Sequence, residues 1–344
     1  MQSWRRQSML QIYKDGLQTT VQDLGRRGFQ KYGVIVSGVM DPYAHRIGNV
    51  LVGNPETDST IEITLVGPQL TFLEDCLFAL TGGDLSPLLN GVPIKMWRPI
   101  FAKKGCKLTF GKPLLGCRTY LAVAGGIAVP EVMDSKSTYL RARIGGYDGR
   151  ALQKGDVVEI GELSQNIRSF IGKLAAATTD SSFIQVDWTL MTKAIPTYQS
   201  QATVRVTEGR QAPLFDEKSQ DAFYKEVFQI SSDSDRMGYR LKGPQLALNE
   251  AKELLSEGVS FGSIQVPPDG QPIILMADRQ TTGGYPKIGQ VASIDLSKVS
   301  QLKPGESIHF EKITLEEAQQ ALLNERRLIT QLTKSISLKF KEGI

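Results

Sequence analysis

The sequence predicts a mainly β protein with a few helices, built from two β-rich halves that repeat one another. Short aliphatic and β-branched runs end at Gly, Pro, Asp or Asn, as strands bounded by turns do. The 33 glycines and 16 prolines suit many tight turns. The clearest runs cover 60–67, 77–82, 119–126, 157–161, 203–209 and 271–278.

Three short segments of the first half recur in the same order in the second half. The pairs are LVGPQL and LKGPQL (65–70 and 241–246), two TGG segments (81–83 and 282–284), and two polar turns that lead into strands (103–110 and 302–310). A conserved order of this kind favours duplication of one barrel-like or sandwich-like domain. We therefore expect 67–110 and 243–310 to superpose as equivalent strands and turns.

One change in composition suggests where the halves meet. Residues 162–182 are small and polar with a short helical piece, which is typical of a connection. We therefore place the first half at 8–165 and the second half at 183–312. A C-terminal helix is expected over 313–344.

Two helices have clear start signals. Asp41 can cap a helix whose first residue is Pro42, and Gly53 can end it. Near the C-terminus, Thr314 and Glu317 have the spacing of a capping box before an apolar stripe.

Composition excludes several classes of protein. The net charge of +4 is spread along the chain, whereas nucleic-acid binding needs a clustered basic stripe. We therefore do not expect nucleic-acid binding.

The three cysteines have no CxxC spacing and there are two histidines, so we expect neither a disulfide framework nor a metal site. The longest apolar run, 120–129, is too short to span a bilayer, and the N-terminus lacks a signal-peptide core. A cytoplasmic protein without membrane contact is expected.

The first candidate site is the loop from Ser37 through Met40 to Asp41. It leads into a helix N-terminus, where free N–H groups and the helix dipole favour an anion. Asp41 and His45 are four residues apart and could meet on one helix face. The alternative is that Asp41 only caps the helix and His45 is a surface residue.

The second candidate is the loop over 278–286, directly after the apolar run 272–277. A buried strand that opens into charges, hydroxyls and glycines resembles a site on a rigid scaffold. The alternative is a plain turn in which Asp278 and Arg279 pair at the surface.

Two weaker candidates complete the set. Arg236 and Arg240 could clamp a carboxylate or phosphate, or could belong to a salt-bridged strand start. Asp84 follows the first TGG segment as Asp278 precedes the second, and could equally be a turn aspartate.

Several motifs are absent from the sequence. It contains no GxxxxGK[ST] phosphate loop, no GxSxG elbow and no Met-Lys biotin-carrier dipeptide. If ATP or biotin takes part in the chemistry, another kind of site or another chain must hold it.

Three long segments resemble the biotin-dependent carboxyltransferase family. They are TTVQDLGRRGFQKYGVIVSGVMDPYAHRIGNVLVGN (19–54), SDRMGYRLKGP (234–244) and DRQTTGGYPKIGQV (278–291). The family includes allophanate hydrolase subunit 2, the carboxyltransferase part of urea carboxylase, and KipA-type proteins, which are also known as the C subunit of 5-oxoprolinase. The resemblance covers roughly 10–310, with the family domain expected at about 24–310. One departure is His45–Asn49, where Ala-Asn is expected before the Leu-Val-Gly-Asn run.

The resemblance implies two cyclophilin-like β-barrel domains and one subunit of an ATP-dependent 5-oxoprolinase. Such an enzyme hydrolyses 5-oxo-L-proline to L-glutamate together with a KipI-like subunit and a LamB/YcsF-like subunit. ATP would act through the complex, and the chain would not be active alone. One alternative is the carboxyltransferase subunit of a biotin-dependent urea or amide carboxylase. Another is a non-enzymatic KipA-type antagonist of a histidine-kinase inhibitor.

Within these motifs we assign expected roles to individual residues. Asp278, Arg279 and Asp41 are expected to be catalytic, by orienting water or holding developing charge. The residues expected to bind substrate are Arg236, Thr281, Thr282, Gly283, Gly284, Tyr285, Ser37 and Met40.

Overall fold

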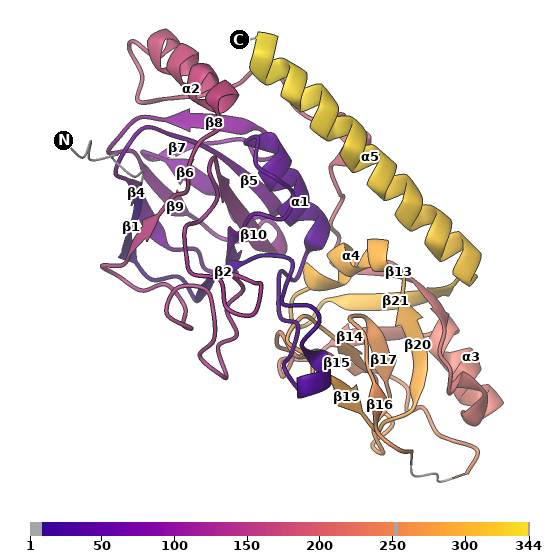
Figure 1. Cartoon of the computed structure of the whole chain (residues 1–344). Helices are drawn as coiled ribbons and strands as arrows, with labels where there is room; N and C mark the ends of the chain where they lie inside the picture. Colours follow the sequence, from indigo (N-terminus) through magenta and orange to yellow (C-terminus); the bar gives the residue numbers. More distant parts are fainter. Residues whose placement is uncertain (1–8, 251–253, 343–344) are drawn as a thin grey trace. The chain divides into compact units, whose positions relative to one another are not determined.

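The computed structural model describes residues 9–250 and 254–342, which divide into two compact units (Figure 1). Unit 1 takes the described residues up to Gly25, then Tyr43–Thr197, and the described residues from Arg327 onward. Unit 2 takes Arg26–Pro42 and Tyr198–Arg326. The expected mainly β class is confirmed, with five α-helices in the described part of the chain.

The strands of unit 1 form two six-stranded sheets, with the orders β11-β1-β4-β9-β6-β7 and β12-β8-β5-β10-β3-β2. Their bounds are β1 (Met9–Lys14), β2 (Gln18–Gln22), β3 (Thr60–Thr64), β4 (Gln69–Phe72), β5 (Cys76–Asp84), β6 (Pro87–Leu89), β7 (Val92–Pro93), β8 (Pro99–Ala102), β9 (Lys107–Phe110), β10 (Leu115–Val123), β11 (Val157–Glu159) and β12 (Phe183–Gln185). Two α-helices accompany them, α1 (Pro42–Leu51) and α2 (Gln165–Ala177).

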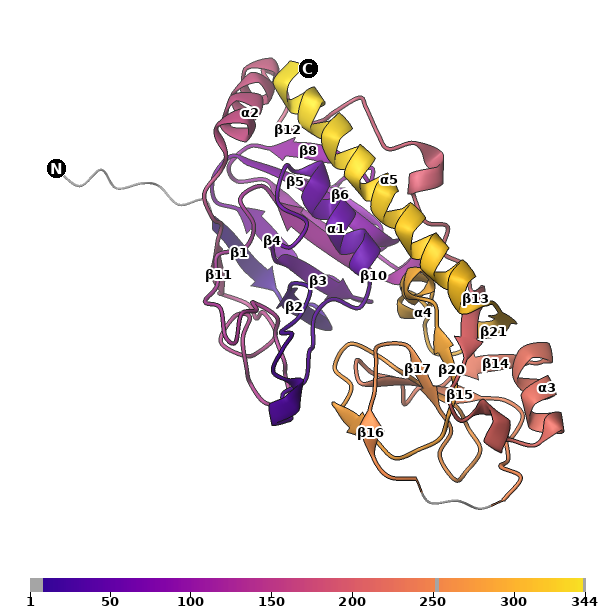
Figure 2. The ribbon, with the colours of Figure 1, turned by 45° about the vertical axis from the view of Figure 1, so that its right-hand side comes forward.

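Both sheets of unit 1 contribute to one apolar core. Phe72 of β4 and Phe78 of β5 stack within it, with ring centroids 4.9 Å apart. In β3, Ile61 and Ile63 point into this core, so the alternating residues of the strand face the other way. That second face is polar yet buried, and α1 lies on part of it (Figure 2), where Thr81 Oγ1 donates to the Ala44 carbonyl at 2.7 Å.

Unit 2 contains a closed barrel with the strand order β13-β20-β17-β18-β15-β14-β21, which confirms the expected barrel in this half. The strands are β13 (Gln201–Glu208), β14 (Val227–Ile230), β15 (Gly238–Lys242), β17 (Ser263–Gln265), β18 (Ile273–Leu275), β20 (Lys287–Val291) and β21 (Ser307–Lys312). A separate two-stranded ribbon pairs β16 (Glu257–Gly258) with β19 (Thr282–Gly283). The pair β13–β21 is parallel, and the other barrel pairs are antiparallel.

Unit 2 also contains α-helices, and aromatic side chains fill the interior of its barrel. The helices are α3 (Glu217–Lys225), α4 (Leu296–Ser300) and α5 (Leu315–Glu342), the last continuing into unit 1 from Arg327. Four short 3-10 turns lie at 30–32, 192–194, 212–214 and 293–295 in the described chain. Phe223, Phe228 and Phe310 meet inside the barrel.

The expected helix signals are confirmed. α1 begins at Pro42, and Gly53 beyond its end has a φ of 77°, a left-handed conformation that glycine adopts without strain. At the start of α5, the Thr314 N–H donates to Glu317 at 2.8 Å and the Glu317 N–H donates back to Thr314 Oγ1 at 3.1 Å. Among the described residues, no helix is long and apolar enough to cross a membrane.

The repeated segments lie in different local structures. Residues 69–70 begin β4, whereas 245–246 follow β15 and belong to no strand. The first TGG lies inside the long strand β5, whereas the second contributes to the short strand β19. The superposition of 67–110 on 243–310 stays a prediction, and so do the domain boundaries drawn from the composition of 162–182.

Candidate functional site

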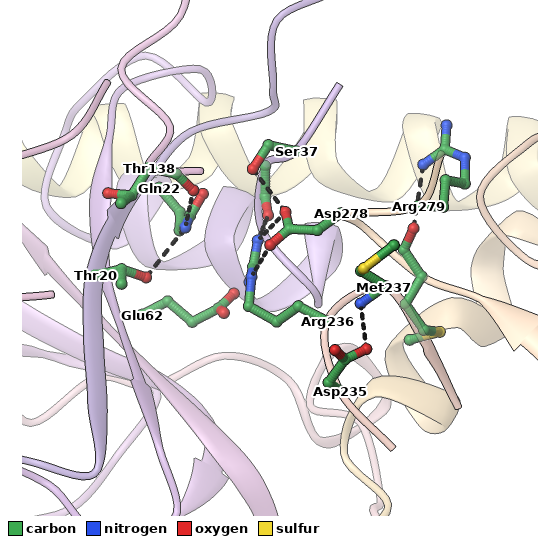
Figure 3. Close-up of polar contacts among 12 residues, drawn as sticks. Thr20, Gln22, Ser37, Glu62, Thr138, Asp235, Arg236, Met237, Asp278 and Arg279 are labelled. Atoms are coloured by element: carbon green, nitrogen blue, oxygen red, sulfur yellow. Dashed lines mark hydrogen bonds and ion pairs between the residues drawn. The ribbon is translucent and has the colours of Figure 1, made fainter. Parts of the chain in front are cut away.

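A buried ion pair lies at the centre of the candidate site of unit 2 (Figure 3). Asp278 follows β18 in a turn, and its carboxylate accepts from Arg236 Nε at 2.9 Å and from Arg236 Nη2 at 3.1 Å. Ser37 Oγ donates to the same carboxylate at 2.7 Å. The side chains of Arg236 and Asp278 are 5% and 7% exposed. The structure thus brings together three expected site residues from three distant segments.

The backbone completes this arrangement. Arg236 Nη2 also donates to the carbonyl oxygen of Gly38, and the Asp278 N–H donates to the Arg236 carbonyl at 2.7 Å. Ser37 has a φ of 57°, a left-handed conformation that costs free energy for a residue other than glycine. Its bond to Asp278 helps to offset that cost. The network therefore holds the Ser37 loop rigidly against the turn at Asp278.

Arg279 does not pair with Asp278, so the alternative of a surface Asp278–Arg279 pair is wrong. Its Nη1 donates to the Met276 carbonyl at 3.3 Å, and its guanidinium lies 5.7 Å from the ring centroid of Phe261. No residue in the described part of the chain bonds its Nε. Burial, helped by the positive charge of Arg27 and opposed by Asp278, lowers the pKa of Arg279 to about 10. The group stays cationic at neutral pH and can hold an anion.

Asp41 lies at the start of α1 and is fully buried. Its Oδ2 accepts from the Tyr198 hydroxyl at 2.9 Å and from Gln301 Nε2 at 3.0 Å, both within unit 2. Met40 is also fully buried and belongs to the apolar core of the barrel. Met40 therefore contributes to apolar packing, and its expected role in substrate binding stays a prediction.

His45 is buried, so the alternative in which it is a surface residue is wrong. Its Nδ1 shares a 2.9 Å hydrogen bond with Thr60 Oγ1, so the expected Asp41–His45 pairing is not seen among its hydrogen bonds. Burial lowers the pKa of His45 to about 3, with smaller opposing contributions from Asp23 and the Glu56 backbone. His45 is therefore neutral at physiological pH.

The rest of the 278–286 loop forms an outer wall of unit 2. Thr282 and Gly283 belong to β19, while Thr281 and Tyr285 are partly or largely exposed. A Cβ at Gly283 would lie 2.5 Å from Gln265 Nε2, so a larger residue there would have to displace the Gln265 side chain. Gly284 and Tyr285 line an apolar cavity of about 790 Å³.

The structure does not support ligand binding by the two weaker candidates, the Arg236–Arg240 clamp and Asp84. Arg236 is buried while Arg240 is exposed on β15, so the two do not form one clamp. Asp84 Oδ1 accepts from the Ser86 N–H at 2.8 Å, which makes it the turn aspartate of the alternative interpretation.

The sequence analysis missed a second polar cluster, on the buried face of the unit 1 sheet. Strand register places Thr20, Glu62, Tyr120 and Thr81 in one row across β2, β3, β10 and β5. The Tyr120 hydroxyl donates to Glu62 at 2.8 Å, and both residues are buried. Gln22 lies on the same face, two residues from Thr20. The available signal was Glu62 between Ile61 and Ile63, a charge inside an otherwise apolar strand.

Comparisons with known proteins agree with these motifs. The family model described as "Carboxyltransferase domain, subdomain A and B" matches residues 32–312. The chain is 41% identical over 324 residues to the C subunit of 5-oxoprolinase from Escherichia coli, covering 94% of this chain and 97% of that protein. It is 39% identical over 310 residues to the protein of the same name from Haemophilus influenzae, covering 90% and 93%.

A solved structure shows the same fold. The crystal structure of the K. lactis urea amidolyase matches with a TM-score of 0.84 and 31% sequence identity, over 96% of this chain but only 20% of that one. The resemblance seen in the three long motifs is thereby confirmed. The chain belongs to the carboxyltransferase-domain family that contains the C subunit of 5-oxoprolinase.

Proposed function

We propose that this chain is the C subunit of an ATP-dependent 5-oxoprolinase, which opens 5-oxo-L-proline to L-glutamate. The observation that carries the proposal is the 41% identity to a protein of that name over 97% of its length. In the urea amidolyase, by contrast, the matching region is 20% of a much longer chain. The extent of the match therefore favours the dedicated 5-oxoprolinase subunit.

The chemistry requires a lactam carbonyl to become reactive. ATP, acting through the complex, would activate the lactam oxygen as a phosphate ester. This chain contributes positively charged and rigidly held groups, which suit the anionic carboxylate of the substrate and the charge that develops during hydrolysis. Arg279 is the group best suited to that charge, because it has no carboxylate partner among the described residues.

Asp278 and Arg236 have a different role in this proposal. Each already satisfies the other's charge, so together they fix the turn from which Arg279 projects and the loop that contains Ser37. Asp278 is therefore a positioning residue in our proposal, whereas the sequence suggested a catalytic one.

The proposed partners are a KipI-like subunit and a LamB/YcsF-like subunit. The relatives are named as one lettered subunit of 5-oxoprolinase, which supports a complex of several chains. The sequence supports the same idea, since it has no phosphate loop that could bind ATP on this chain alone.

A reconstitution assay tests the function. The three proteins are purified separately and mixed, and glutamate release from 5-oxo-L-proline is measured with ATP. We expect release only when all three are present. Equal release without this chain would contradict the proposal.

Carboxyl transfer to urea is the second candidate, favoured by the family model's description and by the urea amidolyase fold. Incubation with carboxylated biotin and urea separates the two. Urea-dependent loss of the carboxyl group, without lactam hydrolysis in the reconstituted mixture, would favour this candidate.

A further inference from the structure

Two polar side chains on the buried face of β2 form an incomplete hydrogen-bonding pair. Thr20 and Gln22 are 1% and 0% exposed and, being two residues apart, face the same side of the strand. Gln22 Nε2 donates to Thr20 Oγ1 and to the Thr138 carbonyl, at 3.0 Å each (Figure 3). These bonds use the nitrogen end of the Gln22 amide.

The orientation of that amide follows from its partners. A backbone carbonyl only accepts, so the group facing Thr138 must be the nitrogen. Gln22 Oε1 is then left without a donor in the described part of the chain. Thr20 Oγ1 accepts from Gln22, so its own proton points elsewhere, and no described residue accepts that proton. An acceptor and a donor thus lie on the same buried face of β2, and no described residue meets either of them.

Unmet buried polar groups are costly, so neighbouring groups of opposite kind are suited to a complement that meets both of them. The complement is a neutral group with an N–H and a C=O on one edge. A ring amide has this arrangement because the ring forces its N–H and C=O to the same side, and urea presents it as well.

We infer that Gln22 Oε1 accepts the N–H of the substrate amide while the Thr20 hydroxyl donates to its carbonyl oxygen. This inference rests on the proposed function. It identifies the amide N–H and carbonyl of the substrate as the groups that unit 1 binds. Glu62, the cross-strand partner of Thr20, carries a carboxylate on the same face. Thr20 and Gln22 are both neutral, so this pair suits the neutral amide edge and the substrate's own carboxylate binds elsewhere.

The inference is tested by removing the N–H from the ligand. Binding of 5-oxo-L-proline, of the γ-lactone in which ring oxygen replaces N–H, and of urea is measured by calorimetry on the full-length chain. For the unmodified chain we expect the lactone to bind at least about 10-fold more weakly than the lactam. In Gln22→Met this difference should disappear, whereas Gln18→Met, a change of the same type on the same strand face, should keep it.

Thr20→Val provides an independent variant if Gln22→Met does not fold. It removes the hydroxyl that serves the carbonyl, so lactam and lactone should both weaken by a similar factor. Discrimination against the lactone without glutamate formation in the reconstituted complex would uphold the inference and reject the proposed 5-oxoprolinase function. Tighter binding of urea than of lactam would identify urea as the source of the amide. Equal binding of lactam and lactone, or no saturable binding of any of the three, would overturn the inference and leave ordered water as the complement.

Discussion

The two polar clusters of this protein are built in opposite ways. In unit 2, Arg236 and Asp278 are charged, and each satisfies the other within hydrogen-bonding distance. In unit 1, Thr20 and Gln22 are neutral, and each has a group that no described residue meets. A satisfied charge pair fixes its surroundings, whereas the unmet neutral pair is the one that we infer to bind substrate. We conclude that burial of polar residues alone does not separate architecture from recognition.

The largest expected effect is on the satisfied pair. Asp278→Ala leaves the Arg236 guanidinium buried without its carboxylate, which should lower the free energy of unfolding by about 3–5 kcal/mol. Asp221→Ala removes the exposed pair with Lys225 and should cost about 0–1 kcal/mol. Urea unfolding curves of both variants make the comparison. Similar losses for the two would show that burial of the Arg236–Asp278 pair does not matter.

The second prediction concerns Arg279, the residue of unit 2 that we propose to hold developing charge. Arg279→Ala should lower turnover in the reconstituted complex by about 100-fold while the protein stays folded, because the unpaired cation would stabilise transition-state charge. Arg240→Ala, an exposed arginine on β15, is the matched control and should keep normal turnover. Turnover and melting curves are measured together, and near-normal turnover of Arg279→Ala would remove Arg279 from the active site.

His45 links the polar face of unit 1 to pH. Its folded pKa of about 3 lies below the usual value of 6.5, so the unfolded chain binds the proton more readily. The stabilising contribution of neutral His45 is therefore complete above pH 6.5 and is lost as the pH falls from 6.5 toward 3. Between pH 7 and pH 5 the loss should be about 2 kcal/mol.

The measurement for His45 is the free energy of unfolding against pH. In His45→Gln the slope over this range should be shallower than in the unmodified chain. His309→Gln changes the only other histidine of the sequence and should leave the slope unchanged. Parallel slopes for all three proteins would contradict the assignment.

The smallest expected effect concerns two tyrosine hydroxyls. Tyr120→Phe removes the donor to the buried Glu62 and should cost about 1–2 kcal/mol. Tyr224→Phe removes a buried hydroxyl that has no partner among the described residues, so it should be neutral or slightly stabilising. Thermal melts of the two variants measure the difference. Equal melting temperatures for the two variants would contradict the hydrogen bond from Tyr120 to Glu62.

Local signals in the sequence predicted local structure well. The Thr314–Glu317 capping box sets a helix start because its bonds lie within one turn. Pro42 is the first residue of α1, as its fixed φ favours. Ser37, Arg236 and Asp278 were assigned to the site within the family motifs, but their mutual contacts could not be predicted because the residues are far apart in the chain. The residue pattern left two alternatives for Asp278, and the surface pair with Arg279 was wrong because Arg236 bonds Asp278 instead.

The polar face of unit 1 could not be predicted for a related reason. Glu62 stands out within β3, but its partner Tyr120 comes from β10, and only the strand register joins them. His45 was expected at the surface because a single histidine on a helix gives no signal of burial. Strand pairing between distant segments therefore decides which polar residues are buried together, and composition does not report it.

The order of the units along the chain has a consequence for biosynthesis. The chain passes between units at 25/26, 42/43, 197/198 and 326/327, so no single cut separates them. A ribosome finishes every residue of unit 2 before the last segment of unit 1, from Arg327 onward, is made. That segment includes Phe340, whose ring contacts Phe170 of α2 at a centroid distance of 5.1 Å. Unit 1 therefore begins synthesis first and is completed last, and a nascent chain truncated before Arg327 can hold a finished barrel beside an unfinished sandwich.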